Sequence, residues 1–459
     1  MPARPRTQIF LASTLYGAAT LAAALDADLF PPAERRLLLI ANNAATPEVH
    51  PALDAMPGFA RLRDRFDGVL SWNETIRPFH PGGWSPRPND VPLWERHLRL
   101  LWELGDDQVE LAVESIQVNP AMALAQLFPD APIDVYADGL MSYGPTRDKL
   151  DPLIGTRIGR LLHLDLVPGL TPLLLTEFGV VPQVVPAEAF TKVLAELADH
   201  SAESGDLAGV PEGAALLLGQ YLSALSILTP QEEEELHVKM VRGAVQRGHR
   251  EIVFKPHPTA PARWSQLLER EAEKLGVALT VLDRPVIAEV LYQRARPALV
   301  VGCFSTALLT ASAFYDLPVA RTGTSLLLDR LTPYQNSNRM PVTLVDALVP
   351  DLADRRPRPR THATPADVGP LVSAVGYAMQ HQIHPQLRPA AERYLATRLD
   401  PYTRRYFKRR RLTALALPGA IPSQLSFIPR NAALRRMARR ARAVQRRLKQ
   451  RRLKKWSAA

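Results

Sequence analysis

Two series of short apolar runs, each interleaved with helix-forming stretches, extend through most of the 459-residue chain. Leucine-rich or β-branched runs that alternate with helical segments are typical of parallel α/β sheets. A stretch rich in Gly, Ser, Asp and Pro, LADHSAESGDLAGVPEGA, separates the two series near residues 200–212. We therefore expect two Rossmann-like domains, residues 1–205 and 206–390, that face each other across a cleft, followed by a basic helical tail over residues 391–459.

The apolar runs predict where the strands lie. In the first series they are IFLAST, RRLLLIANN, VELAVES, PIDVYADG, LHLDLVPG and PQVVP, and in the second AALLLGQYL, EIVFKPHP, ALTVLD, PALVVGCFS and LPVAR. Predicted helices between them include PLWERHLRLLWEL, NPAMALAQLF and QEEEELHVKMVRGAVQRG. Ligands of such sheets bind beyond the carboxyl ends of the strands, so polar residues at those ends are the candidate site residues.

The first thirty residues allow two interpretations. Arg4 and Arg6, followed by an apolar stretch and small residues, resemble a signal peptide. Alternatively, residues 9–13 form a strand, residues 15–17 a tight turn, and a helix begins at Ala18. We favour this second interpretation because polar residues and a glycine stand where a strand-to-helix turn needs them.

Composition narrows the class of protein. Hydrophobic residues make up 46% of the chain, which fits a globular protein. No uninterrupted apolar run reaches the roughly 18–20 residues that span a bilayer. Cys303 is the only cysteine, which excludes an internal disulfide and a multi-cysteine zinc site. We therefore expect a cytoplasmic protein.

The positive charge is concentrated in the tail. From Pro401 to the end there are 19 Lys and Arg and no Asp or Glu, so the global net charge of +10 comes from this segment. The tail has apolar residues at helical spacings and an aromatic residue near its end: Leu434, Met437, Ala441, Val444, Leu448 and Trp456. This pattern allows a solvated basic arm, an amphipathic helix on anionic lipid or a nucleic-acid-binding arm.

The strand PIDVYADG ends in Asp138-Gly139. Asp-Gly is a common turn, which is the structural explanation of this pair. A carboxylate at the carboxyl end of a strand also faces the cleft, where it can act as a general base. Asp138 is therefore a candidate catalytic residue, and Gly139 a candidate for the acceptor side of the site.

The strand EIVFKPHP ends in Lys255-Pro256-His257-Pro258. Each proline fixes its own φ and keeps the residue before it out of the helical region, so His257 is held extended. An oriented, protonated histidine can donate to a phosphate oxygen as charge builds on a leaving group. We expect a functional role for His257, with Lys255 adding positive charge nearby.

The strand PALVVGCFS leads into a helix that opens with Ser305-Thr306. Such residues are often only helix N-caps. Free N–H groups and the helix dipole also favour an anion at that end, and the two hydroxyls would complete such a site. The chain contains no G-x-x-x-x-G-K-[ST] or G-x-G-x-x-G pattern, so ATPase and dinucleotide-binding functions lose their usual support.

Further polar residues and glycines stand at or near strand ends. They are about as well explained by loop and capping chemistry. The candidates for donor contacts are Gly302, Gln220 and Glu289, and those for the acceptor side are Ser13, Thr14, Gly17, Asn42 and Asn43.

Together, in this order, the motifs ADG, KPHP and FST resemble those of the bacterial polysialyltransferase family and the related bacterial sialyltransferases. That group carries a D/E-D/E-G motif in its first domain, K-x-H-P in its second and a Ser-Ser or Ser-Thr pair later. The resemblance covers about residues 7–390 and leaves out the tail. It implies the GT-B glycosyltransferase layout. One departure is Ala137, which occupies the position of the motif's first acidic residue.

The resemblance also implies a reaction: inverting transfer of a sialic acid from a CMP-activated donor to a glycan acceptor, without an essential metal or other cofactor. Asp138 would match the family's base and His257 its acid or charge stabiliser. Ser305 and Thr306 would hold the phosphate of the departing CMP. Such an enzyme builds capsule or other surface polysaccharide, so we expect the tail to bind the inner membrane face peripherally.

Two other functions stay open. A transferase that uses a CDP-alditol or another nucleotide-sugar donor would have the same layout with similar His-Pro and Ser motifs. A non-enzymatic nucleic-acid-binding protein with a degenerate α/β body would bind RNA or DNA through the tail. The body shows no interleaving of aromatic and basic residues, which makes nucleic acid the less favoured partner.

Overall fold

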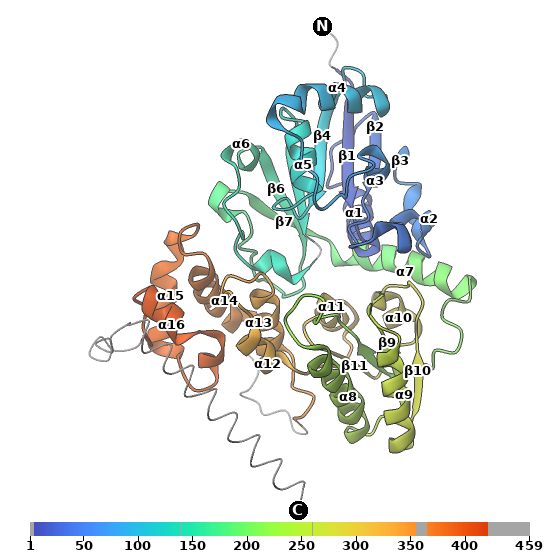
Figure 1. Cartoon of the computed structure of the whole chain (residues 1–459), viewed down its shortest axis with the longest axis vertical. Coiled ribbons are helices and arrows are strands. Elements are labelled where there is room, and N and C mark those ends of the chain that lie inside the picture. Colours follow the sequence, from blue (N-terminus) through green and yellow to red (C-terminus); the bar gives the residue numbers. More distant parts are fainter. Residues whose placement is uncertain (1–3, 138, 259, 355–364, 421–459) are drawn as a thin grey trace, which may run out of the picture. The chain divides into compact units, whose positions relative to one another are not determined.

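The computed structural model describes residues 4–137, 139–258, 260–354 and 365–420. Residues 1–407 form one compact unit and residues 408–459 a second. The first unit contains two parallel β-sheets with helices packed around them (Figure 1). The prediction of two parallel-sheet α/β domains is thus confirmed.

The first sheet has seven strands in the order β3-β2-β1-β4-β5-β6-β7, all paired in parallel. Its strands are β1 (Arg6–Ala12), β2 (Arg35–Ile40), β3 (Gly68–Ser71), β4 (Gln108–Glu114), β5 (Ile133–Ala137), β6 (Ile158–Leu164) and β7 (Val181–Val185). The accompanying α-helices are α1 (Leu15–Asp26), α2 (Phe59–Arg63), α3 (Trp72–Thr75), α4 (Val91–Leu101), α5 (Ala121–Leu127), α6 (Pro152–Gly155) and α7 (Ala187–Glu203).

The second sheet has five parallel strands in the order β10-β9-β8-β11-β12. Its strands are β8 (Ala215–Leu218), β9 (Glu251–Lys255), β10 (Ala278–Val281), β11 (Leu299–Gly302) and β12 (Val319–Arg321). The helices between them are α8 (Pro230–Gln246), α9 (Arg263–Leu275), α10 (Ala288–Arg294) and α11 (Thr306–Tyr315). Thr229 and Glu232 cap α8 reciprocally, which explains why this helix begins where it does.

A helical segment follows the second sheet. It consists of α12 (Thr324–Arg330), α13 (Arg339–Leu348), α14 (Pro365–Met379) and α15 (Arg388–Arg398). Asp346 of α13 is fully buried and accepts hydrogen bonds from Thr324 and, through its other oxygen, from Tyr406. This carboxylate therefore ties the chain after α15 to α13. In the second unit, α16 (Arg409–Ala414) is the described α-helix.

The interior strands are almost wholly apolar because helices cover both faces of each sheet. β1 shows this best, since Ile9 to Ala12 are buried in succession. The strand-to-helix interpretation of the N-terminal segment is confirmed by β1 and α1. The expected turn at residues 15–17 was wrong: α1 begins at Leu15, because the Thr14 side chain accepts from the Gly17 N–H and caps the helix.

Two more differences concern the edge of the first sheet and the tail. β3 was not predicted, because its four half-buried residues, GVLS, contain no continuous apolar run. The basic segment 421–459, with its proposed amphipathic pattern, lies outside the described residues.

Strand order defines the position of a crevice in each sheet. In the first sheet the order reverses between β1 and β4, and in the second between β8 and β11. Loops that leave two such neighbouring strands diverge to opposite faces and leave room for a ligand at their carboxyl ends. α7 packs against α1 in the first sheet's layer and α10 in the second's, so it joins the two α/β halves (Figure 1).

Candidate active site

The turn after β5 touches the start of α11. The Leu140 N–H donates to Thr306 Oγ1 over 3.4 Å, and a Cβ added to Gly139 would lie 3.1 Å from the same oxygen. Residues from the ADG and FST motifs, more than 160 positions apart in the sequence, are thus in direct contact. Asp138 itself lies outside the described residues.

The crevice of the second sheet is held together by Gln220. This residue follows β8, and its Oε1 accepts from the Phe304 N–H, which follows β11, at 3.0 Å. Ser305 next caps α11 by accepting from the Ala307 N–H at 3.3 Å. The loop and the first turn of this ten-residue helix are therefore fixed in place. Hydroxyl groups and the positive end of a helix dipole at one place suit an anion.

These residues line one cavity of about 480 Å³. Gly139 comes from the first sheet's side, and Gln220, Ser305 and Thr306 come from the second's. Among the described residues that line it, Glu114 has the one acidic side chain and Arg147 the one basic side chain. Among the described residues, the cavity therefore combines a helix terminus that suits an anion with one carboxylate and one guanidinium group.

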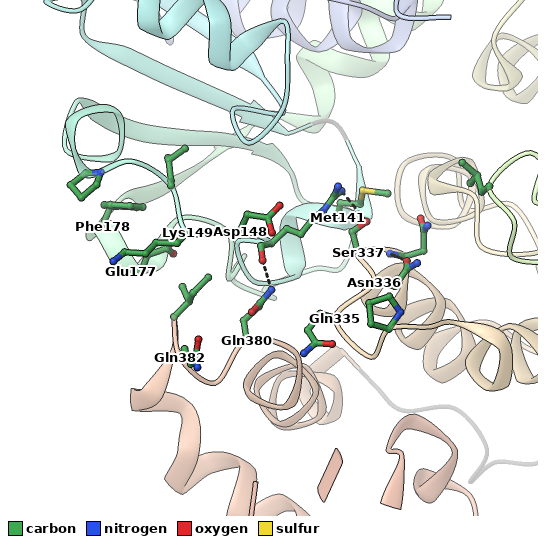
Figure 2. Close-up of a pocket in the computed structure, with 17 residues that line it drawn as sticks. Met141, Asp148, Lys149, Glu177, Phe178, Gln335, Asn336, Ser337, Gln380 and Gln382 are labelled. Carbon is green, nitrogen blue, oxygen red and sulfur yellow. Dashed lines mark hydrogen bonds between the residues drawn. The ribbon is translucent and has the colours of Figure 1, made fainter. Parts of the chain in front are cut away.

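A larger cavity of about 1140 Å³ shares several wall residues with the first, among them Met141 and Arg147. Figure 2 shows its walls, which carry five carboxamides besides acidic and basic groups. The carboxamides belong to Gln335, Asn336, Asn338, Gln380 and Gln382. Arg147 contacts two other segments of the wall: its guanidinium donates to Ser337 Oγ at 2.9 Å, and its carbonyl accepts from Gln380.

The KPHP motif lies next to this site and does not line either cavity among the described residues. Lys255 is only 8% exposed and its Nζ donates to the Arg284 carbonyl at 2.9 Å. Burial lowers the pKa of Lys255 from 10.5 to about 8. Partial loss of hydration, and next the charge of Lys255, lower the pKa of His257 below its ordinary value. The His257 ring lies 6.2 Å from that of Tyr221, the residue after Gln220.

The family described as Alpha-2,8-polysialyltransferase (POLYST) matches residues 8–324, which include both sheets and all three motifs. The chain belongs to this family. It is therefore a glycosyltransferase of the sialyltransferase type, as the motifs predicted. None of the curated proteins matches the sequence.

Solved structures with a similar arrangement include other glycosyltransferases. A Photobacterium sp. JT-ISH-224 2,6-sialyltransferase in a complex with CMP and lactose is 13% identical and covers 76% of this chain and 79% of its own, with a TM-score of 0.42. The GT-B domain of a Photobacterium damselae sialyltransferase is 11% identical and covers 74% and 96%, with a TM-score of 0.39. UGT2 of Phytolacca americana, complexed with UDP-2-fluoroglucose and pterostilbene, is 12% identical and covers 90% and 99%, with a TM-score of 0.40.

The remaining candidates for donor contacts in this polysialyltransferase-family chain have packing roles. A Cβ on Gly302 would lie 3.2 Å from the Leu308 side chain, so a glycine lets α11 pack closely on β11. Glu289 is buried in the first turn of α10, and its negative charge acts to raise the pKa of Lys255 against the effect of burial. A direct contact of either with a nucleotide stays a prediction.

The candidates for the acceptor side fall into two groups. Ser13 and Thr14 form the connection between β1 and α1, and Thr14 accepts at 2.9 Å from the N–H of Gly17, which lies in the first turn of α1. Asn42 lines a separate cavity of about 620 Å³, and its amide donates to the carbonyls of Pro47 and His50. That amide holds the loop, which also contains Asn43. The structure does not bring these residues to the cavity that Gly139 lines.

Residues of the 480 Å³ cavity that were not predicted from the sequence include Glu114, Gln117 and Arg147. Glu114 ends the predicted strand VELAVES, so the strand-end rule that selected Asp138 could also have selected it. Gln117 accepts from the backbone N–H groups of Arg147 and Asp148 and so holds the Arg147 loop. No local pattern indicates this contact between distant loops.

Neither a metal-binding cluster nor a membrane-spanning helix is found among the described residues. In that part of the chain, no group of three or more His, Cys, Asp or Glu side chains could hold a metal ion. No helix within it is long and apolar enough to cross a membrane.

Proposed function

We propose that this chain moves a nonulosonic acid, of the sialic acid type, from a CMP-activated donor to a hydroxyl group of a glycan acceptor, with inversion at the anomeric carbon. The observation that supports this most directly is the contact between the turn after β5 and Thr306. It joins the strand end expected to carry the base to the helix terminus suited to a phosphate.

The donor phosphate is assigned to the start of α11. Ser305 and Thr306 line the cavity, and the N-terminus of α11 offers a positive dipole end there. Negative charge grows on the phosphate as its bond to the anomeric carbon breaks, so groups aimed at it act more strongly in the transition state. Lys255 adds positive charge from the adjacent strand end, and His257 acts there as the hydrogen-bond donor to the leaving phosphate.

The acceptor hydroxyl is assigned to the first sheet's side. Its oxygen attacks the anomeric carbon from the face opposite the phosphate, its proton passes to the Asp138 carboxylate, and the bond to CMP breaks. One displacement of this kind inverts the anomeric configuration. The carboxamides around the larger cavity both donate and accept hydrogen bonds, which suits the hydroxyl and acetamido groups of a glycan (Figure 2). We therefore assign the glycan chain to that cavity and its reacting end to the adjoining 480 Å³ cavity.

Nucleotide binding tests the donor. Thermal unfolding of the full chain is measured with millimolar CMP, CDP, UDP, UMP and ADP, since a ligand stabilises a protein by RT ln(1 + [L]/Kd). We expect the largest increase with CMP. A larger increase with CDP or UDP would favour a CDP-alditol or another nucleotide-sugar donor, and no response to any nucleotide would refute a transferase site here.

Matched cap variants locate that binding. Ser305→Ala removes the cap of α11 and a hydroxyl of the proposed phosphate site, whereas Thr229→Ala removes the cap of α8 alone. Both substitutions lower stability by about 1 kcal/mol. We expect only Ser305→Ala to weaken the stabilisation by CMP.

We further propose that the basic tail holds the enzyme peripherally at an anionic membrane surface. The 19 basic residues from Pro401 onward, without an acidic one, support this, because each Lys or Arg near such a surface contributes about 1 kcal/mol. Co-sedimentation with vesicles that contain 30% phosphatidylglycerol, compared with neutral vesicles and with a chain ending at residue 420, tests it. Equal binding to both vesicles, or binding of RNA in preference to them, would refute it.

A further inference from the structure

Glu114 occupies the switch point of the first sheet. It is the last residue of β4, and β1 and β4 are the neighbours between which the strand order reverses. The chain turns sharply just after it, because Ser115 adopts a left-handed conformation with φ 45°. Non-glycine residues in this region cost free energy and are concentrated at functional sites. The carboxylate thus stands where a ligand of this sheet is expected.

The neighbouring strand orients this carboxylate. Glu114 is in register with Tyr136 of β5, and the buried Tyr136 hydroxyl lies 3.2 Å from Glu114 Oε2 and 2.9 Å from the Leu11 carbonyl of β1. The three central strands therefore all contribute to the position of one carboxylate. Ala137, the next residue of β5, lines the same cavity as Glu114.

The chemistry of the cavity gives Glu114 a function. It is the one acidic side chain among the described residues that line the cavity, to which Ser305 and Thr306 contribute hydroxyl groups. An ionised carboxylate only accepts hydrogen bonds, so it attracts a hydroxyl or amide N–H of a ligand and repels an anion. It therefore favours the acceptor's hydroxyl groups on the side of the first sheet and keeps the donor phosphate on the side of α11.

We propose that Glu114 binds and orients the glycan acceptor by accepting a hydrogen bond from one of its hydroxyl groups. This inference rests on the proposed function, because it names a residue of the same transfer site. It makes Glu114 a specificity residue: the acceptor presents a hydroxyl donor at this point, and an acceptor with a carboxylate there is excluded. Tyr136 acts through Glu114 as a positioning residue.

The test separates acceptor binding from donor binding. Transfer kinetics of the full chain are measured with varied acceptor for the wild type, Glu114→Gln and a control, Glu110→Gln. Glu110 lies on the same strand, where it pairs with Arg6 and Gln8 away from the cavity. Glu114→Gln keeps an acceptor oxygen but loses the negative charge that strengthens the hydrogen bond, so we expect kcat/KM for the acceptor to fall by about 10-fold in this variant alone.

Two further measurements distinguish a role in acceptor binding from a loss of folding or of donor binding. Stabilisation by CMP should be unchanged in Glu114→Gln, which shows that the variant is folded and that the donor site is intact. Glu114→Ala with Ala137→Glu returns a carboxylate to the same cavity from the adjacent strand, and we expect it to regain part of the acceptor kcat/KM that Glu114→Ala loses.

The possible failures are distinct. A wild-type chain that neither responds to CMP nor transfers a sugar refutes the proposed function. A wild type that does both, with an unchanged acceptor kcat/KM in Glu114→Gln, refutes the role of Glu114 and leaves the proposed function standing. A fall in CMP stabilisation in Glu114→Gln also overturns the inference, because it assigns the residue to the donor.

Discussion

Lys255 in the KPHP motif carries a buried positive charge, so its contribution to the free energy of unfolding can be predicted. Its side chain is 8% exposed and its pKa is lowered by burial from 10.5 to about 8. Each pKa unit corresponds to about 1.4 kcal/mol, so keeping Lys255 charged at pH 7 costs the folded state about 3 kcal/mol. Replacement by methionine removes this cost, but it also removes the hydrogen bond to the Arg284 carbonyl, which contributes about 1 kcal/mol. We expect Lys255→Met to be more stable at pH 7 by about 2 kcal/mol.

The pH dependence of this stability difference tests the lowered pKa of Lys255 more directly. Between the folded pKa of about 8 and the unfolded value of 10.5, the unfolded chain binds more protons at this site. The free energy of unfolding of the wild type therefore gains from this residue as pH rises through that window, and Lys255→Met lacks the gain. The advantage of the variant should be largest below pH 8 and shrink toward pH 10.

Urea unfolding followed by circular dichroism at pH 7, 8, 9 and 10 measures this difference. Lys239→Met, at an exposed position of α8, is the matched control, and we expect a change within about 0.5 kcal/mol at every pH. A Lys255→Met variant that is less stable at pH 7, or whose advantage does not change with pH, would refute the reasoning. Since the buried charge is costly, we also expect this stabilised variant to transfer sugar more slowly than the wild type.

Two further sets of substitutions test the contact of Gly139 with Thr306 and the ion pairs of Arg321 with Asp346 and Asp351. Gly139→Ala places a Cβ 3.1 Å from Thr306 Oγ1, so we expect it to lower the free energy of unfolding in urea by about 1 kcal/mol. The double variant Gly139→Ala with Thr306→Ala should lose less than the sum of the two single variants. Strictly additive losses would contradict the contact. Asp346→Asn breaks a buried ion pair with Arg321, so we expect it to lower the free energy of unfolding by about 3–5 kcal/mol. Asp351→Asn also removes an ion pair with Arg321, but the Asp351 side chain is 32% exposed and the loss should be about 1 kcal/mol or less. Equal losses would show that the Asp346 ion pair contributes no more to stability than the exposed one.

Local patterns in the sequence predicted the strands that run through each sheet and the residues at their ends. Buried parallel strands contain continuous apolar runs, so β1, β2 and β11 are visible without any knowledge of their neighbours. The same rule indicated Gly139, Gln220, Ser305 and Thr306, which all line one cavity. β3 was missed because a short, half-buried edge strand carries too few apolar residues to stand out.

What the sequence could not predict depends on contacts between distant loops. Arg147 reaches Ser337 and Gln380 across about two hundred residues, and no periodicity records such a pairing. The lowered pKa of Lys255 could not be predicted either, because it depends on burial in the folded chain and on the charges of Asp283 and Glu289. These properties belong to the assembled structure, and composition leaves them open.

The two sheets contribute unequal parts of the same site, and the strand order explains why both are needed. The crevice between β8 and β11 provides hydroxyl groups, a helix terminus and the bond from Phe304 to Gln220, which together suit an anion. The crevice at β4 and β5 provides the Glu114 carboxylate and the turn at Gly139, which suit a hydroxyl donor. Transfer requires a leaving group that gains negative charge and a nucleophile that loses a proton, and one electrostatic environment does not favour both. In the proposed mechanism, the helix terminus beside β11 faces the leaving phosphate and the Glu114 carboxylate at the end of β4 faces the acceptor hydroxyl, so each sheet provides one of the two environments.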